Sequence, residues 1–295
     1  MSKPIEELTF SDSFMFGAVL TRNLGLCKEI LELILDRRIS SISFSNAEQY
    51  LEAAPDSKSV RLDVYLEDDT SKAYDFEMQA YDEPDIAARS RYYQANVDIN
   101  LMAKKEKYQD LPDSYIIFVC TKDYFNRGLC KYTYENICHE TGDPLNDRTK
   151  KIFLNAAGED KTISSGLRDF LDYIAGKGTH SDLTERIDAA VAAARKDRNV
   201  RMAYLSYDLA LQSSEDRGIA KGEIISIVDQ IWKKLKKNKP ISVIADETET
   251  DEQQVERIVE LIHSHGEDYD KKVIGSEYME KYYMPSEEGK SRYHR

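Results

Sequence analysis

The chain is poor in the residues that build zinc sites, disulfide frameworks and serine-hydrolase triads. Only four cysteines and five histidines occur among its 295 residues. The cysteines are not arranged in Cys-x-x-Cys pairs, so their spacing favours neither a zinc ribbon nor a disulfide scaffold, and reduced thiols are expected. A Gly-x-Ser-x-Gly motif is also missing, which leaves a Ser-His-Asp hydrolase without support.

Long apolar runs are missing as well. No window of the sequence approaches the roughly 18 consecutive apolar residues that a membrane-spanning helix needs. The opening residues, MSKPIEELTF, lack the basic and apolar regions of a secretory signal. Hydrophobic residues make up 41% of the chain and charged residues 32%, a balance typical of a globular protein with a polar surface. We therefore expect a cytoplasmic protein that has no membrane partner.

Positive charge is also in short supply. The chain has 41 Lys and Arg residues against 54 Asp and Glu residues, a formal net charge of −13. This balance argues against indiscriminate coating of DNA, because phosphate binding depends mainly on Lys and Arg contacts. It does not exclude a nucleic-acid enzyme, because such an enzyme needs only a local basic patch and a bound metal ion also neutralises phosphate charge.

The most informative stretch covers residues 60–79, VRLDVYLEDDTSKAYDFEMQ, which has the pattern of two strands joined by a polar turn. In the first strand, alternation places Asp63 on one face together with Arg61 and Tyr65. In the second strand, three polar residues share one face: Asp75, Glu77 and Gln79. If the apolar faces of the two strands share a core, the carboxylates of Asp63 and Glu77 can approach each other.

This acidic face allows two interpretations. Paired carboxylates repel each other unless a proton or a cation relieves them, and oxygen-rich sites of this kind suit Mg²⁺ or Mn²⁺. Alternatively, the acids lie on the solvated face of an ordinary antiparallel hairpin and bind nothing. Alternation alone does not decide between the two, since it is satisfied by any half-buried sheet.

A family resemblance favours the metal site. The hairpin resembles the Asp, then Glu-x-Lys, signature of the PD-(D/E)xK nuclease superfamily, with Gln79 in place of the lysine. More narrowly, residues 61–79 followed by RSRYYQ at 89–94 resemble the Rpn family of recombination-promoting nucleases, also called PD-(D/E)xK family transposases. FSDSFMF at 10–16 and KIFLNAAGED at 151–160 also resemble that family, so the resemblance covers about the first 180 residues.

The resemblance implies roles for several residues. Asp63 and Glu77 would bind Mg²⁺, with Mn²⁺ as a possible substitute, and Glu32 on the first long helix would add a third oxygen. Gln79 would orient the attacking water or the phosphate, although it lacks the positive charge of lysine. Arg89, on the helix after the hairpin, would hold a phosphate or act as a compensating cation. An ordinary helix-to-sheet ion pair is the structural alternative for Arg89.

DNA is the partner that the resemblance implies, and five residues around the hairpin are candidate contacts. The basic residues and one tyrosine near the site are Arg61, Arg91, Tyr93, Lys104 and Lys105. The lysines also fit a solvated helix end that the helix dipole favours. A homodimer is expected as well, because a double-strand cut needs two active sites or two binding events.

The predicted fold class is α/β, with a restriction-endonuclease-like mixed sheet flanked by helices. A helix over residues 23–37, a buried strand over 114–121 and a helix between them that crosses over the sheet support this class. We predict a nuclease-like domain at 1–180, a helical extension at 181–265 and a polar tail at 266–295. The extension contains a possible degenerate helix-turn-helix, whose second helix begins with acidic rather than basic residues.

Three functions remain open from the sequence. The first is a metal-dependent DNA endonuclease of the Rpn type, which hydrolyses a phosphodiester with a metal-activated water. The second is a catalytically weak or inactive nuclease-fold protein that serves in a mobile-element or defence complex. The third is an unrelated α/β interaction protein with a solvated acidic hairpin.

Overall fold

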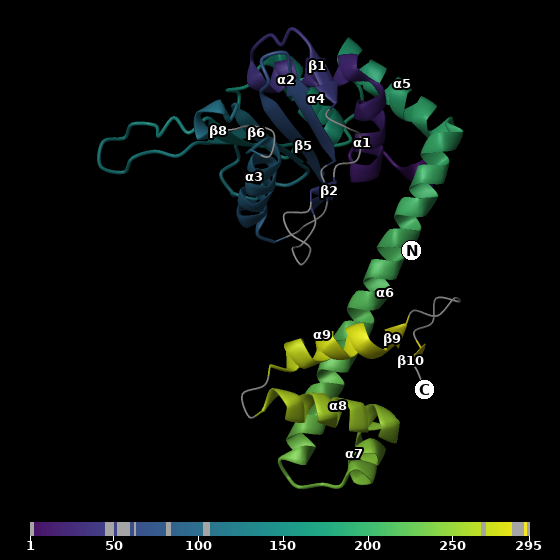
Figure 1. The fold of residues 1–295 in the computed structure, drawn as a ribbon. Coiled ribbons are helices and arrows are strands. Elements are labelled where there is room, and N and C mark those ends of the chain that lie inside the picture. Colours follow the sequence, from purple (N-terminus) through teal and green to yellow (C-terminus); the bar gives the residue numbers. More distant parts are fainter. Residues whose placement is uncertain are drawn as a thin grey trace. The chain divides into compact units, whose positions relative to one another are not determined.

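A computed structural model describes residues 3–44, 50–51, 60–61, 63–80, 84–102, 107–266, 270–284 and 292–293. The chain divides into two compact units, Met1–Tyr204 and Leu205–Arg295. The first unit contains the sheet, and the described part of the second is mainly helical (Figure 1). The predicted domain bounds at residues 180 and 265 are a different division, which stays a prediction.

The first unit is built on a mixed sheet of six strands in the order β1-β4-β5-β6-β8-β7. Strand β5 pairs antiparallel with β4 and parallel with β6, and β6 pairs parallel with β8. The strands are β1 (Ile42–Phe44), β4 (Val64–Asp68), β5 (Ala73–Gln79), β6 (Ser114–Cys120), β7 (Lys131–Tyr134) and β8 (Thr149–Asn155). The predicted α/β mixed-sheet core is therefore confirmed.

Helices cover both faces of this sheet. Helix α3 (Ile86–Met102) lies along one face and connects β5 to its parallel neighbour β6 (Figure 1). On the other face, α1 packs against β4 and β5, and the ring of Phe16 meets that of Phe76 at 4.9 Å. Helix α1 (Ser13–Arg22) packs in one group with α2 (Leu24–Leu35), α4 (Ser165–Ile174) and α5 (Asp182–Lys196). Two short 3-10 helices cover Ile5–Glu7 and Tyr108–Asp110.

Full burial of the central strands follows from this arrangement. Every residue of β5 and of β6 is buried. The continuous apolar run of β6 suits a strand covered on both faces. Strand β5 instead alternates, and its polar residues turn toward α3 while Tyr74, Phe76 and Met78 turn toward the α1 side.

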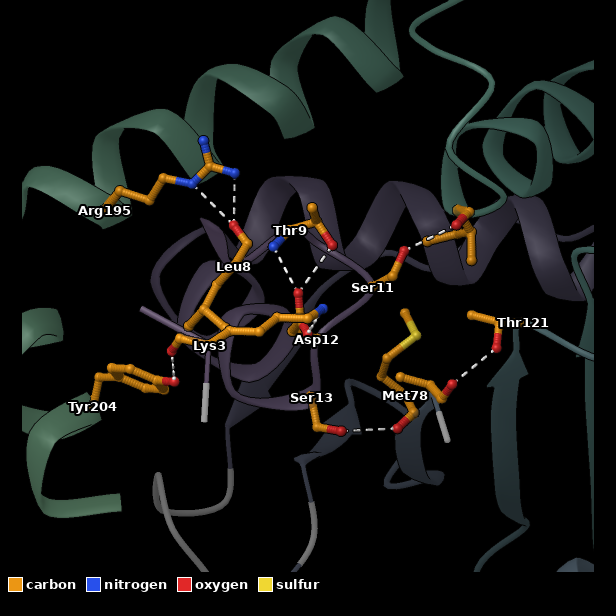
Figure 2. A network of polar contacts seen from close by, with 12 residues as sticks. Lys3, Leu8, Thr9, Ser11, Asp12, Ser13, Met78, Thr121, Arg195 and Tyr204 are labelled. Atoms are coloured by element: carbon orange, nitrogen blue, oxygen red, sulfur yellow. Dashed lines mark hydrogen bonds and ion pairs between the residues drawn. The ribbon is translucent and has the colours of Figure 1, made fainter. Parts of the chain in front are cut away.

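The segment before α1 connects several elements of the first unit (Figure 2). Arg195 of α5 donates two hydrogen bonds to the Leu8 carbonyl, at 2.9 and 2.6 Å. Ser11 Oγ donates to the Ile174 carbonyl of α4 at 2.9 Å. Asp12 accepts a bond from the Thr9 amide at 2.7 Å and an ion-pair contact from Lys3 at 2.8 Å. These bonds join the segment before α1 to α4 and α5.

The second unit has its own apolar core. Helix α6 (Arg198–Leu235) carries residues of both units, and its later part packs with α7 (Ile241–Thr248), α8 (Glu252–His265) and α9 (Lys271–Tyr282). The remaining short strands are β2 (Tyr50–Leu51), β3 (Val60–Arg61), β9 (Tyr283–Met284) and β10 (Arg292–Tyr293). Helix α9 lies within the predicted polar tail, and its Ile274 and Tyr278 are fully buried.

Helices α7 and α8 form the predicted helix pair. The exposed side of α8 carries Glu252, Glu256 and Glu260, and acidic side chains on a recognition helix oppose contact with DNA phosphates. None of the helices in the described ranges is long and apolar enough to cross a bilayer.

Replacing Gly158 by alanine should destabilise the first unit. An added Cβ at Gly158 would lie 2.7 Å from the Leu129 carbonyl oxygen and 2.8 Å from the Cys130 Cα, both rigid backbone atoms. We expect a loss of about 1–3 kcal/mol in unfolding free energy, measured by thermal or urea unfolding. Gly25→Ala is the control, because its Cβ would meet nothing within 4 Å. Equal stability of the two variants would contradict the close contact at Gly158.

Candidate functional site

The polar face of β5 is the most unusual part of the first unit, because it is buried. The exposed fractions are 0% for Asp75, 4% for Glu77 and 5% for Gln79. Helix α3 covers this face, and the apolar cluster around it includes Tyr65 of β4 and Val97 of α3. The interpretation of the hairpin as a solvated acidic face is therefore wrong, because water does not reach these carboxyl groups freely.

Asp63 and Glu77 are held together by reciprocal bonds to the backbone. The Asp63 amide donates to Glu77 Oε1 at 2.7 Å, and the Met78 amide donates to Asp63 Oδ2 at 3.0 Å. The predicted proximity of the two acids is thus present. The expectation of one continuous strand from residue 60 is wrong, however. Asp63 gives its amide hydrogen to a side chain, so the ladder of β4 starts at Val64, and β3 pairs with β2 instead.

Arg89 of α3 lies beside these acids and binds Gln79. Its Nη1 donates to Gln79 Oε1 at 2.5 Å, and its Nη2 donates to the Tyr93 hydroxyl at 3.2 Å. The guanidinium carbon lies 5.5 Å from the ring centre of Tyr93 and 5.6 Å from that of Phe118, within the range of cation–π attraction. Two hydrogen bonds and two cation–π contacts therefore hold the guanidinium in one place.

Helix α1 approaches the same place from the opposite side of the sheet. Ser13 Oγ donates to the Met78 carbonyl at 3.0 Å (Figure 2). A Cβ added at Gly17 would lie 3.2 Å from the Asp63 carbonyl oxygen, so a residue with a side chain would push α1 and the Asp63 backbone apart. The helix therefore braces the backbone on both sides of the acid pair.

Burial changes the pKa values in this group. It raises the pKa of the Asp75 carboxyl from 3.8 to about 8 and raises that of Glu77 well above 4.5. The positive charge of Arg89 acts in the opposite direction on both acids. Burial, with a contribution from the Glu77 charge, also raises the pKa of Tyr93 to about 12. Perturbed acids beside a fixed cation are typical of functional sites.

Glu32 lies in a different group of charges. Its carboxylate accepts a bond from the Ile39 amide at 2.7 Å and pairs with Arg38 at 3.1 Å and Lys28 at 3.6 Å. The Ile39 amide is the main cause that lowers the Glu32 pKa. The structure does not bring Glu32 to Asp63 or Glu77, and its role as a metal ligand stays a prediction.

The candidate DNA contacts divide into three cases. Arg91 is exposed on α3, whereas the Tyr93 hydroxyl is engaged by Arg89. Lys104 and Lys105 lie outside the described residues, as does the side chain of Arg61. The predicted DNA contacts at these five positions stay predictions.

A divalent cation suits the chemistry of the buried acids. Mg²⁺ and Mn²⁺ prefer carboxylate oxygens, and both carboxyl oxygens of Asp75 are buried without a hydrogen-bond partner among the described residues. Buried carboxylates normally have hydrogen-bond partners or a counter-charge. Over the part of the chain that the structure describes, no three Asp, Glu, His or Cys side chains are grouped closely enough to hold an ion as they stand. The donor type and charge of the buried acids fit a cation, whereas the present spacing of the described side chains does not.

Three residues of the site were not predicted from the sequence. Asp75 carries a signal that could have identified it, because alternation places it on the same face as Glu77 and Gln79. Ser13 and Gly17 carry no comparable signal, because their importance comes from contacts with distant parts of the chain. Ser13 contacts Met78, which is 65 positions away, and Gly17 approaches Asp63, which is 46 positions away.

Comparison with known proteins adds one result. A family model described as PD-(D/E)XK nuclease family transposase matches residues 14–174. This range includes the whole hairpin and α3, and it ends before α5 begins. Searches of curated proteins and of solved structures find no match.

The stability of the metal-free protein should fall as the pH rises from about 4 to about 8. The pKa of Asp75 is raised from 3.8 to about 8 by burial, so between these values the folded chain binds more protons than the unfolded chain. Asp75→Asn should make the fall shallower, since asparagine does not titrate. Thermal unfolding in EDTA across this pH range measures both slopes. Identical slopes for the two proteins would contradict the raised pKa.

Proposed function

Because the chain belongs to the PD-(D/E)XK nuclease family transposases, we propose that it is a metal-dependent DNA endonuclease of the Rpn type. The family establishes a nuclease-type domain, and nucleases of this kind generally use divalent metal ions. The observation that carries the proposal is the reciprocal bonding of Asp63 and Glu77, beside a Gln79 that is bound to Arg89. This places two acids and one cation at the end of β5.

In this proposal Asp63 and Glu77 hold the divalent cation, Mg²⁺ or Mn²⁺. When bound, the ion would polarise the phosphodiester, acidify a water molecule and stabilise the additional negative charge of the transition state. The protein residues supply the fixed geometry. The backbone bonds between residue 63 and residues 77 and 78 keep the two acids in register, and Ser13 fixes the Met78 carbonyl next to them.

Gln79 and Arg89 would together perform the role that the family motif gives to lysine. Arg89 binds the amide oxygen of Gln79, and the amide nitrogen is on the other branch of the side chain. That nitrogen is a hydrogen-bond donor and would orient a water molecule or a phosphate oxygen. The positive charge that glutamine lacks would come from the guanidinium, which stabilises a developing phosphate charge.

DNA would reach the site past the exposed Arg91 of α3. The net charge of −13 makes us expect weak binding that depends strongly on salt, because few phosphates would be neutralised. A homodimer stays a mechanistic prediction, since a double-strand cut needs two active sites or two binding events. Light scattering of the purified protein would determine the oligomeric state.

A second candidate is a catalytically weak or inactive nuclease-fold protein that acts through interactions. Two observations favour it: glutamine replaces the motif lysine, and the exposed side of α8 is acidic. It differs from the endonuclease proposal in one measurable respect, namely whether purified protein cleaves DNA when a divalent metal is added.

The wild-type protein should cleave supercoiled plasmid DNA in the presence of Mg²⁺ or Mn²⁺ and should be inactive in EDTA. Asp63→Asn and Glu77→Gln keep the side-chain shapes but remove the charges that hold the cation. We expect each change to lower the cleavage rate at least about a hundredfold. Asp98→Asn is the control, because it removes an acid of α3 that is bound to Gln94 instead.

Two outcomes of this assay would reject the endonuclease function. One is equal background nicking by the wild type and both site variants. The other is an inactive wild type under all metal conditions, which would favour the interaction protein.

Arg89→Ala should lower the cleavage rate by about tenfold or more, since it removes the proposed charge and the hydrogen bond that Arg89 donates to Gln79. Adding Gln79→Lys to Arg89→Ala should recover part of the activity, because lysine returns a positive charge to the same strand position. Arg91→Ala is the matched comparison and should raise KM rather than lower kcat. An Arg89→Ala protein with wild-type rates would remove Arg89 from the mechanism.

A further inference from the structure

Asp75 is a buried acid for which the described residues supply no hydrogen-bond donor unless Glu77 carries a proton. Its exposed fraction is 0%, and neither of its carboxyl oxygens has a hydrogen-bond partner among the residues described. An ionised carboxylate in such a place is costly unless a counter-charge or hydrogen-bond donors accompany it. The burial of the Asp75 carboxyl therefore needs a physical explanation. The roles of Asp63, Glu77 and Gln79 do not provide one.

The neighbours of Asp75 in the sheet offer it no donor. Its register partners are Tyr65 on β4 and Ile116 on β6. The Tyr65 hydroxyl donates to Glu67 at 3.5 Å, and isoleucine has no polar side-chain group. A charged or polar partner from the two flanking strands is therefore missing.

The buried polar residues of α3 are also bound elsewhere. Ser90 Oγ donates to the Ala87 carbonyl at 2.8 Å. Gln94 Nε2 donates to Ser114 Oγ at 2.6 Å and to Asp98 at 2.9 Å. Arg89 acts on Asp75 through its charge, and its two terminal nitrogens donate to Gln79 and Tyr93. The hydrogen-bond donors of Ser90 and Gln94 on α3 are thus bound to groups other than Asp75.

The group that Asp75 does face is a second carboxyl. Glu77 is two residues further along β5 on the same face, and its carboxyl lies within interaction distance of that of Asp75. Two carboxyl groups can hydrogen-bond only when one of them carries a proton. A divalent cation is the other species that removes their repulsion, and it prefers these oxygen ligands. Asp63, which is bonded to Glu77, adds its negative charge to the pair.

We propose that Asp75 is a ligand of the divalent cation together with Glu77, so that the site has one more carboxylate than the motif residues Asp63 and Glu77. This inference rests on the proposed function, because it assigns a further residue to the same cation site. A proton shared between the two acids is the competing explanation. It predicts that loss of the Asp75 charge does not affect metal affinity.

Calorimetric titration of the metal-free, full-length protein with Mn²⁺ alone tests the proposal. We expect Asp75→Asn to weaken Mn²⁺ binding at least about tenfold, a loss comparable to that of Glu77→Gln. Asp98→Asn, which removes a half-buried acid of α3, should bind Mn²⁺ as the wild type does. Asp75→Ser provides a second uncharged variant in case asparagine impairs folding.

Thermal unfolding distinguishes a metal ligand from a purely structural residue. Loss of a ligand reduces the rise in unfolding temperature that Mn²⁺ causes, whereas loss of a structural residue does not. In EDTA, Asp75→Asn should unfold at the wild-type temperature or higher, since a buried group without partners is replaced by a neutral amide. Addition of Mn²⁺ should then raise its unfolding temperature less than it raises that of the wild type. Lower stability in EDTA together with an unchanged Mn²⁺ response would overturn the proposal in favour of a structural acid pair.

The role of Asp75 and the nuclease function are tested by different measurements, Mn²⁺ binding and DNA cleavage, so they can fail separately. Wild-type Mn²⁺ affinity in both Asp75 variants would overturn the role of Asp75 and leave the DNA cleavage result untouched. Weakened Mn²⁺ binding in these variants, with no cleavage by the wild type, would support the ligand and reject the endonuclease. Absence of Mn²⁺ binding by the wild type would overturn the inference itself.

Discussion

Helix α3 covers the face of β5 on which Asp75, Glu77 and Gln79 lie, and this burial of carboxyl groups governs the chemistry of the first unit. Without water, two neighbouring acids stay charged together only when a cation joins them, and otherwise one of them takes up a proton. The positive charge of Arg89 lowers the pKa of each of these acids, but less than burial raises it. An acidic hairpin of the same sequence on an open sheet face would have none of these properties.

Arg89 links the helix to the strand chemistry. It is bound to Gln79 and Tyr93, and its guanidinium carbon lies 5.5 Å from the ring centre of Tyr93 and 5.6 Å from that of Phe118. A side chain with several fixed contacts loses little further entropy when a substrate binds, which is the advantage of preorganisation. In the proposed mechanism, glutamine replaces the motif lysine because the strand supplies an amide at Gln79 and the helix supplies the positive charge at Arg89.

The other side of the sheet contributes through the backbone rather than through charge. Gly17 lets α1 approach the Asp63 carbonyl, and Ser13 holds the Met78 carbonyl. The bonds of the preceding segment to α4 and α5 keep that helix in position. The placement of Asp63, which lies outside any regular strand, therefore depends on packing at some distance from the acids.

The sequence by itself determined the mixed α/β class, the position of the hairpin, the approach of Asp63 to Glu77 and the family. These features could be predicted because alternation along a strand decides which of its residues share a face. The family could be predicted because its motif consists of residues close together in the sequence. Only the tertiary structure decided that this face is buried and that Asp75 has no hydrogen-bond partner among the described residues. It also decided that Arg89 binds Gln79 and that Glu32 joins other charges. Periodicity does not show which helix will cover a face. Burial, donor supply and the resulting pKa shifts depend on contacts between segments that are distant in the chain.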